Sequence, residues 1–451
     1  MANTAADFDL DLLHPKVQAI GATLSAGLGK VASRLVVDML TGMLVSGSVR
    51  LTEIARALDE SIPLHSTHKR LSRNLGNPRI GAVVRDNVLN AGARTVRDDA
   101  LLVIDVFDVV KQYAEKMEYL AASSTADDTA RPPGGVGDMQ GDGGERGYRV
   151  CEIFAWDLDG GPIPDFAEFA ERMPSETGGA EELSAWNNLV LTPLAHTLYS
   201  PHAPDYRSDM DEVVGLLSRV DAVLEGRGIF AIDIGDFPVR LRRHSYQLLA
   251  RLRELPEVLT AEIRCRYAAR IPGDYPLLHG NSPTTARELG DSCDTPYGVT
   301  VYKYQDNVDF GMFVHFGAVP VRLPACPDRP LWLVAVKGIP SADLSVSDFL
   351  ILTTEPMPRN RKVIWPLVWR FLSYWDAVRT NQEVKDQFDF DDVRVLTYDR
   401  LRNLGALVLA AAYVESQWPG ITFRTSMHRE PRSRSPRLLR HTPPDQPSPI
   451  P

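Results

Sequence analysis

Two aspartates that interrupt or end apolar runs are the residues whose surroundings suggest chemistry. Asp105 lies in the run 101–108, and Asp233 follows the run 228–232. Short apolar runs rich in β-branched residues are typical of buried central strands. A carboxylate at the end of a buried strand is costly unless it is paired or binds a cation. One such aspartate is readily explained by a helix cap or a salt bridge, but two in matching contexts favour a functional site.

Two aspartates on neighbouring strands would suit a two-metal phosphoryl-transfer site. Such a site holds two divalent ions roughly 4 Å apart, one activating the attacking oxygen and the other stabilising the leaving oxygen. Mg²⁺ (or Mn²⁺) suits a site made of few carboxylates and substrate phosphates. We therefore predict Asp105 and Asp233 as catalytic and metal-binding residues. A third acid is expected on the long helix that begins near Trp365.

The elements that would position these aspartates follow an order typical of an α/β protein. Helical spacing of apolar residues is found at 17–44, 51–58, 211–224, 241–252, 365–388 and 398–414. Strand-like runs are found at 101–108, 148–156 and 228–233, and then repeatedly from 258 to 354, beginning with 260–266. This alternation predicts a mixed sheet flanked by helices, with a helical N-terminal region and a β-rich insertion.

A basic helix in the N-terminal region suggests contact with DNA. A helix at 51–58, a turn with Pro63 and a second helix at 66–75 have the outline of a helix-turn-helix. Lys69, Arg70 and Arg73 lie on the second helix and are predicted to bind DNA. A charged face turned toward solvent explains these three residues equally well.

Composition narrows the class of protein. The chain has 451 residues and a net charge of -10, which argues against a surface that is basic throughout but leaves room for a local basic patch. The four cysteines are isolated and form no C-x-x-C pair, which favours buried or loop thiols over zinc or redox chemistry. The apolar run 404–414 is much shorter than the roughly 20 residues that a spanning helix needs, so a cytoplasmic protein without membrane contact is expected.

Several short sequence motifs, spread over most of residues 20–415, are considered as one set. They are 104–111 with 113–120, Gly147-Tyr148, 232–236, 350–354, and 385–395 with Tyr398, Arg400-Leu401 and Asn403-Leu404. In these motifs the chain resembles the DDE transposases of bacterial insertion sequences, in the group marked by Tyr-x2-Arg-x3-Glu-x6-Lys. The resemblance implies an RNase H-like fold, binding of double-stranded transposon-end and target DNA as a dimer, and Mg²⁺-dependent cleavage and strand transfer.

The resemblance also suggests how the chain is divided. Residues 1–95 would form the helical region with the possible helix-turn-helix, and 96–256 the first part of an RNase H-like core. Residues 257–356 would form the β-rich insertion, and 357–418 the helical completion of the core. The Arg- and Pro-rich residues 419–451 are expected to be a disordered basic tail, and 121–147 an enlarged loop.

The chain departs from the family pattern at the third acid. When the Lys of the signature is aligned with Lys385, the signature Glu falls at Val378, the signature Arg at Tyr374 and the signature Tyr at Phe371. A valine cannot bind a metal ion. The neighbouring acids Asp376 and Glu383 lie well off the face of Val378 at 100° per residue, so neither is a simple substitute.

Two interpretations of function remain open from the sequence. The first is a transposase that performs two-metal cleavage and strand transfer, impaired by the loss of the acid at position 378. The second is a catalytically inactive derivative that binds DNA or another protein. Lys385 is predicted to contact DNA in either DNA-binding case, although a solvated helix face explains it equally well.

Overall fold

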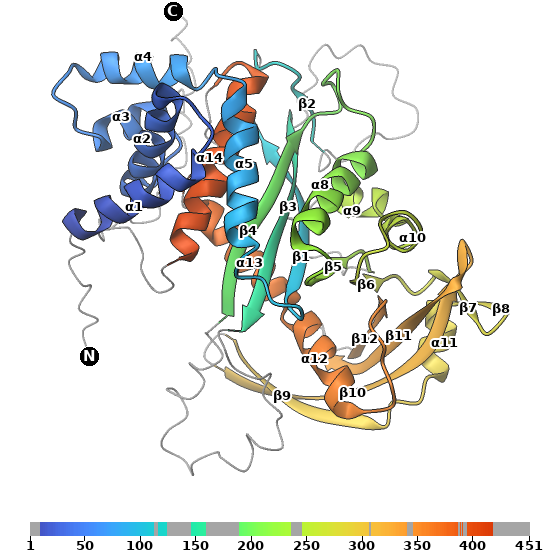
Figure 1. The fold of residues 1–451 in the computed structure, drawn as a ribbon. Helices are drawn as coiled ribbons and strands as arrows, with labels where there is room; N and C mark the ends of the chain where they lie inside the picture. The colour runs from blue at the N-terminus through green and yellow to red at the C-terminus, as the bar shows by residue number, and fades with distance from the viewer. Residues whose placement is uncertain are drawn as a thin grey trace, which may run out of the picture.

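The apolar run that carries Asp105 forms the central strand β1 (Leu101–Val110) in a computed structural model of the chain. The structure describes residues 10–111, 116–123, 146–158, 189–235, 246–305, 308–340, 346–386, 388, 390 and 395–417. The described strands form one mixed, open sheet of 12 strands (Figure 1). Their order is β2-β3-β1-β5-β6-β12-β11-β10-β7-β8, with β4 paired to β3 and β9 paired to β10. The predicted α/β fold with a mixed sheet and flanking helices is confirmed.

The first part of the sheet is built around β1. β3 (Arg146–Leu158) pairs antiparallel with β1, and β4 (Leu189–Tyr199) pairs antiparallel with β3. On the other side, β5 (Ile229–Asp233) runs parallel to β1, and β6 (Tyr267–Ile271) runs parallel to β5. Because β1 has a partner on both edges and helices on both faces, its residues are almost all apolar.

The β-rich segment continues the same sheet through β6. β12 (Val346–Thr353) pairs antiparallel with β6, and β11 (Cys326–Pro340) and β10 (Val308–Leu323) follow in antiparallel order. The remaining strands of the sheet are the short β2 (Ala121–Ala122), β7 (Pro276–His279), β8 (Ser282–Thr285) and β9 (Tyr297–Gln305), and α11 (Ala286–Ser292) follows β8. The expected boundary at residue 257 therefore does not separate two sheets.

The strand predicted at 260–266 is wrong. The structure has a short helix α10 (Leu255–Val258), a π-helical turn η3 (Leu259–Ile263), and a strand that begins only at Tyr267. The hydroxyl of Thr260 donates to the carbonyl of Pro256 at 2.7 Å, which suits a helical turn. The β-branched side chains in this stretch favour a strand by propensity, and burial of the helical turn overrides that preference.

Two predicted long helices are each broken in the structure. The N-terminal one is α1 (Leu10–Leu24) and α2 (Lys30–Ser46), separated by a turn in which Gly27 has φ of 89°. The C-terminal one is α12 (Arg361–Leu372) and α13 (Tyr374–Asp386), separated at Ser373. The helical spacing of apolar residues continues across such short breaks, so the sequence pattern does not reveal them.

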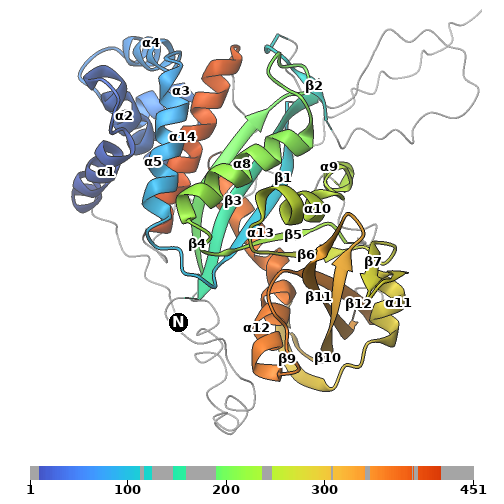
Figure 2. The same cartoon turned by 45° about the vertical axis from the view of Figure 1, so that its right-hand side comes forward.

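Helices cover both faces of the first part of the sheet (Figure 2). α8 (Asp209–Leu224), α9 (Tyr246–Arg251) and α10 pack on one face with Leu102 and Ile104 of β1. α12 and α13 pack on the opposite face with Leu101 and Val103 of β1. The alternation along β1 therefore divides its side chains between two separate apolar cores.

Three N-terminal helices, α1, α2 and α5 (Arg79–Gly92), pack on α14 (Tyr398–Ser416). α3 (Leu51–Ala57) and α4 (Leu64–Asn74) pack on α2. The amide of Asn403 on α14 donates to the carbonyl oxygens of Leu75 at 2.7 Å and Asn77 at 2.9 Å, and its Oδ1 accepts from the backbone N–H of Gly81 at 2.8 Å. The side chain of Asn403 thereby fixes the link between α4 and α5 against α14.

Three motifs of the transposase resemblance meet beside α14. The hydroxyl of Tyr148 donates to the backbone carbonyl of Glu118 at 2.6 Å, and the backbone N–H of Tyr398 donates to the Glu118 carboxylate at 2.8 Å. The rings of Tyr148 and Tyr398 stack with centroids 6.0 Å apart. These residues connect β3, the segment around 118 and α14, so their role in the structure is to join distant parts of the chain.

No single helix within the described ranges is long and apolar enough to cross a membrane. The bent pair of α2 and α3 reaches the necessary length and apolar composition only when the two helices are taken together. The predicted enlarged loop lies largely outside the described residues, which resume at 146, and the predicted tail at 419–451 lies entirely outside them.

Candidate two-carboxylate site

Asp105 and Asp233 lie on neighbouring parallel strands at the same level. The register of β1 on β5 pairs Leu101 with Ile229 and Val103 with Ala231. Asp105 lies two residues after Val103, and Asp233 lies two residues after Ala231. The paired part of the two strands ends at Val103 and Ala231, so each aspartate follows two residues after the last pair.

Both aspartates belong to the sheet face covered by α13. Side chains two residues apart on a strand share a face, so Asp105 follows Val103 and Asp233 follows Ala231 into the core beneath α12 and α13. The hydroxyl of Tyr374 on α13 donates to the backbone carbonyl of Ile104 at 2.9 Å, which holds this helix against β1. Asp105 is 6% exposed and Asp233 is 2% exposed.

Two further charged residues extend the line of the two aspartates across the sheet. Glu152 of β3 stands directly opposite Asp105, and Arg270 of β6 is paired with Asp233. Four neighbouring strands therefore carry Glu152, Asp105, Asp233 and Arg270 side by side. The amide of Asn381 on α13 donates to Glu152 at 3.2 Å, so the helix also contacts this end of the row.

Protein donors bind both oxygens of the Asp233 carboxylate. Oδ2 accepts from Nη1 of Arg270 at 3.1 Å and from the indole N–H of Trp375 at 2.9 Å, and Oδ1 accepts from the backbone N–H of Gly235 at 3.0 Å. Burial raises the pKa of Asp233 above its ordinary value, and the charge of Arg270 and the hydrogen bonds act in the opposite direction. The Arg270 guanidinium balances the charge of the buried carboxylate.

The helix expected to carry the third acid presents apolar and aromatic groups instead. Val378 is 1% exposed and belongs to the same core as Val103 and Ala231. Tyr374 is buried, and burial followed by the charges of Asp233 and Asp105 raises the pKa of its hydroxyl well above the ordinary value. Glu383 is exposed on α13, and the side chain of Asp376 lies outside the described part of the chain.

The described part of the row does not by itself provide a complete set of ligands for a divalent ion. Among the described residues, no group of three or more His, Cys, Asp or Glu side chains is arranged to hold a metal ion. The row contains several carboxylate oxygens, but the carboxylate of Asp233 already accepts hydrogen bonds from Arg270 and Trp375. Mg²⁺ requires carboxylate oxygens that are available to the ion.

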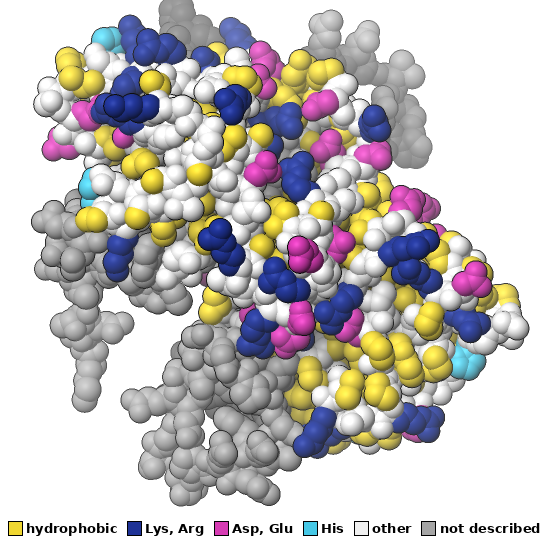
Figure 3. Space-filling model, viewed as in Figure 1, with side chains coloured by type: hydrophobic (Ala, Val, Ile, Leu, Met, Phe, Trp, Pro, Cys, Tyr) yellow, Lys and Arg dark blue, Asp and Glu magenta, His cyan; other side chains and the backbone are white. Residues whose placement is uncertain are grey.

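The residues predicted to bind DNA are in different environments. Lys69 and Arg73 are exposed on α4. Arg70 is bonded to Asp38 at 2.6 Å and to Glu60 at 2.9 Å, so its guanidinium stabilises the N-terminal helices. Lys385 belongs to α13, but its side chain is not among those that the structure describes. Figure 3 shows Lys and Arg side chains over the surface of α3 and α4 and between α5 and α8.

Sequence reasoning did not single out Glu152, Arg270 or Trp375. Glu152 lies in a predicted strand, but only the antiparallel register places it opposite Asp105. Arg270 lies on a strand that was predicted too early in the chain, so its pairing with Asp233 could not be foreseen. The only signal for both was a charged residue within an apolar run.

The comparisons with known proteins provide no family for this chain. No model of a protein family matches it, and no curated protein matches it. The resemblance to DDE transposases therefore rests on the motifs in the sequence alone.

Proposed function

We propose that this chain is a transposase-like DNA-binding protein whose strand-cleaving site is blocked. The transposase part of the proposal is supported by the motifs and by the strand arrangement. In the order β4-β3-β1-β5-β6, four strands run in one direction and β3 alone runs in the opposite direction. This arrangement is compatible with the RNase H-like core that the resemblance implies.

The DNA-binding part is supported by the N-terminal helices. α3 and α4 lie close to the sequence ranges predicted for two consecutive helices, and Lys69 and Arg73 are exposed on the second of them. Exposed cations on one helix can contact phosphates whatever the DNA sequence. Binding as a dimer stays a prediction.

The hydrogen bonding of Asp233 is the observation that carries the proposed block. A two-metal site needs carboxylates that can bind cations, and a guanidinium already occupies Oδ2 of Asp233. The charge of Arg270 also repels a divalent ion from the same place. With Val378 in the position of the third acid, the residues do not fit a pair of divalent ions.

The second candidate function is an active transposase that cleaves and joins DNA strands with Mg²⁺ or Mn²⁺. The register that brings Asp105 and Asp233 to the same level of adjacent strands favours it. This candidate requires Arg270 to release Asp233 and another group to replace the acid missing at Val378.

Binding of Mn²⁺ separates the two candidates. We would titrate the full chain with Mn²⁺ by calorimetry, comparing wild type, Arg270→Gln and the control Arg266→Gln. Arg266 precedes the same strand and forms its own ion pair with Glu355 at 2.6 Å, so the control also loses a salt bridge. The blocked site predicts no binding by wild type or Arg266→Gln, and binding by Arg270→Gln that a further Asp105→Asn removes.

Two results would contradict the block. Mn²⁺ binding by the wild type that disappears in Asp105→Asn would establish the second candidate. A folded Arg270→Gln variant that binds no Mn²⁺ would show that Arg270 is not what keeps the ion out. If Arg270→Gln does not fold, the wild-type titration with and without Asp105→Asn still decides between the candidates.

A further inference from the structure

Few apolar contacts hold α4, the helix that carries the exposed cations Lys69 and Arg73. Only Thr67 and Leu71 are buried within it, and Leu64 at its start is 41% exposed. Figure 1 shows α4 at the edge of the group of N-terminal helices. Because tertiary packing of an apolar face supplies most of the stability of a helix in a protein, α4 needs other contacts to fix its position.

Polar side chains from three elements supply those contacts. Nη1 of Arg70 on α4 donates to Asp38 on α2 at 2.6 Å, and Nη2 donates to both carboxylate oxygens of Glu60 at 2.9 Å. Glu60 lies in the turn between α3 and α4, and it also accepts from the hydroxyl of Thr67 at 2.8 Å and from Arg34 of α2 at 3.0 Å. These five residues, the α4 network, connect α4 to α2 and to the turn.

The α4 network is largely shielded from water. The side chains of Arg70, Asp38 and Glu60 are 20%, 16% and 19% exposed. Burial acts to raise the pKa of the Glu60 carboxyl, but hydrogen bonds from Thr67 and Arg70 outweigh it and hold that pKa below its ordinary value. Bonds between a guanidinium and carboxylates fix direction as well as distance, so the network can set the orientation of α4.

The backbone of the turn before α4 also depends on these contacts. Asp59 has φ of 41°, in the left-handed region that residues with a Cβ atom rarely adopt. Such a conformation persists where the surrounding contacts determine it. Glu60, the next residue, provides these contacts through its bonds to α2 and α4. The network therefore sets both the turn and the direction in which α4 leaves it.

The network and the exposed cations occupy different sides of α4. Lys69 and Arg73 are four residues apart, so they share one face of the helix. Arg70 is displaced from Lys69 by 100° around the helix axis, and its guanidinium points to α2 and the turn. The two carboxylates bound to Arg70 also repel a phosphate from the same place.

We propose that Arg70 is a positioning residue, which holds α4 so that Lys69 and Arg73 meet DNA phosphates together. It acts through its bonds to Asp38 and Glu60 and does not itself contact DNA. This inference rests on the proposed DNA binding by α4. It replaces the direct DNA contact predicted for Arg70 by an indirect role.

Replacement of arginine by lysine separates the two roles. Arg70→Lys keeps the charge, but a single ammonium group does not reproduce the fork that binds two carboxylates. We expect the DNA affinity of the full chain to fall roughly threefold or more. The matched control is Arg56→Lys on α3, where an exposed arginine pairs with Glu53 at 2.7 Å, and it is expected to match the wild type. Equal affinities in all three chains would overturn the inference.

Neutralising a carboxylate of the network gives the two accounts opposite signs. Glu60→Gln makes a chain of net charge -10 less negative, which by long-range attraction alone would strengthen DNA binding. The positioning role predicts weaker binding, because Arg70 loses one of its two charged partners. Tighter binding by Glu60→Gln would contradict that role.

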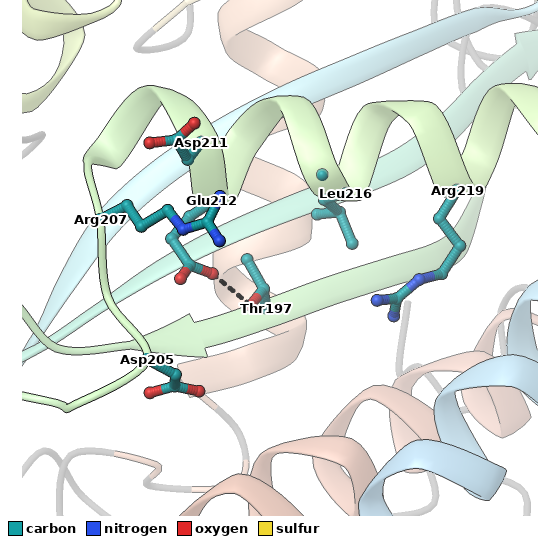
Figure 4. Close-up of a pocket in the computed structure, with 8 residues that line it drawn as sticks. Thr197, Asp205, Arg207, Asp211, Glu212, Leu216 and Arg219 are labelled. Atoms are coloured by element: carbon teal, nitrogen blue, oxygen red, sulfur yellow. Dashed lines mark hydrogen bonds between the residues drawn. The ribbon is translucent and has the colours of Figure 1, made fainter.

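A second pair of variants tests DNA binding by α4 itself. Arg73→Gln is expected to weaken binding roughly tenfold and to reduce the slope of log affinity against log salt by about 1. Arg219→Gln removes the same charge from α8. Figure 4 shows Arg219 beside a pocket of about 250 Å³ whose lining includes the carboxylates of Asp205, Asp211 and Glu212. Because this surface is not basic, Arg219→Gln is expected to match the wild type, and equal losses in the two variants would contradict DNA binding by α4.

Hydrogen exchange measures the hold on α4 without DNA. We expect faster exchange of the amides of residues 64–74 in Arg70→Lys, and no change there in Arg56→Lys. If the wild type binds no DNA, the proposed function fails, and this measurement still decides whether Arg70 positions α4. Equal exchange in all three chains would overturn the inference. If Arg70→Lys does not fold, Glu60→Gln takes its place in both measurements.

Discussion

The carboxylate of Asp233 is held by donors from three parts of the chain. Arg270 comes from the next strand, Trp375 from α13 and Gly235 from the turn after β5. Each of these contacts satisfies a lone pair that a metal ion would otherwise need. At the scale of the residue, the site is therefore arranged as a buried ion pair.

The buried carboxylate makes a testable contribution to the pH dependence of stability. Burial raises the pKa of Asp233 in the folded chain above its ordinary 3.8. The folded state then binds this proton more tightly than the unfolded state, so stability from this group is present at low pH and is lost as pH rises through the folded pKa. We expect the free energy of unfolding of wild type, relative to Asp233→Asn, to fall as pH increases above about 4.

Chemical denaturation of both proteins across the acidic range measures this difference. Asp211→Asn, at an exposed position, is the matched control for loss of a carboxylate. A wild-type curve that rises relative to Asp233→Asn over the same range would mean that Arg270 outweighs burial and lowers the pKa of Asp233.

The positions of the two aspartates could be predicted from the sequence, but their partners could not. Asp105 and Asp233 interrupt or end apolar runs, and that pattern is local. Glu152 and Arg270 reach the same row only through strand pairing, and pairing is decided by contacts between residues far apart in the chain. The absence of an acid at Val378 was visible in the sequence because the motif fixes its spacing from Lys385.

At the scale of the elements, a buried salt bridge connects β3 to α8. Nη1 of Arg149 contacts the two carboxylate oxygens of Asp209 at 2.7 and 2.9 Å, and the two side chains are 7% and 5% exposed. Arg251, which lies on α9, adds a contact to Asp209 at 3.0 Å. One aspartate thus connects a strand and two helices on the face opposite to α13.

Removing this aspartate should destabilise the fold strongly. Asp209→Asn leaves the guanidinium of Arg149 buried without a counter-charge, which costs about 3–5 kcal/mol for an ion pair of this kind. The control is Asp211→Asn, an exposed residue of the same helix that bonds, among the described residues, only to the N-cap Ser208, which is expected to change the free energy of unfolding by about 1 kcal/mol or less. Urea denaturation measures both. Similar small losses in the two variants would show that the buried pair contributes little.

Most elements with regular patterns were predicted, but α5 was missed although Ile80, Val84 and Val88 have helical spacing. α14 lies close to its predicted range of 398–414 because its apolar residues are nearly continuous. β4 was missed because Pro193, Thr192 and His196 interrupt its apolar pattern, and its pairing with β3 contains an irregularity near the proline. Neighbouring strands override the weak local preference at such places.

At the scale of the whole molecule, α4 presents a local basic surface. It carries the exposed side chains of Lys69 and Arg73. Under the proposed function, the overall charge of -10 requires DNA to approach by a local basic surface and not by a general attraction. DNA binding should therefore weaken steeply with added salt.

One gel of the wild-type chain tests the central claim most directly. A labelled duplex from the DNA that flanks the gene would be incubated with the full chain in Mn²⁺ at low and high salt. The same gel would report the fraction of DNA that is bound and the length of the DNA. A blocked transposase-like protein predicts a retarded band at low salt, its loss at high salt, and DNA of unchanged length throughout. Cleaved DNA would contradict the block, and no retarded band at low salt would contradict DNA binding.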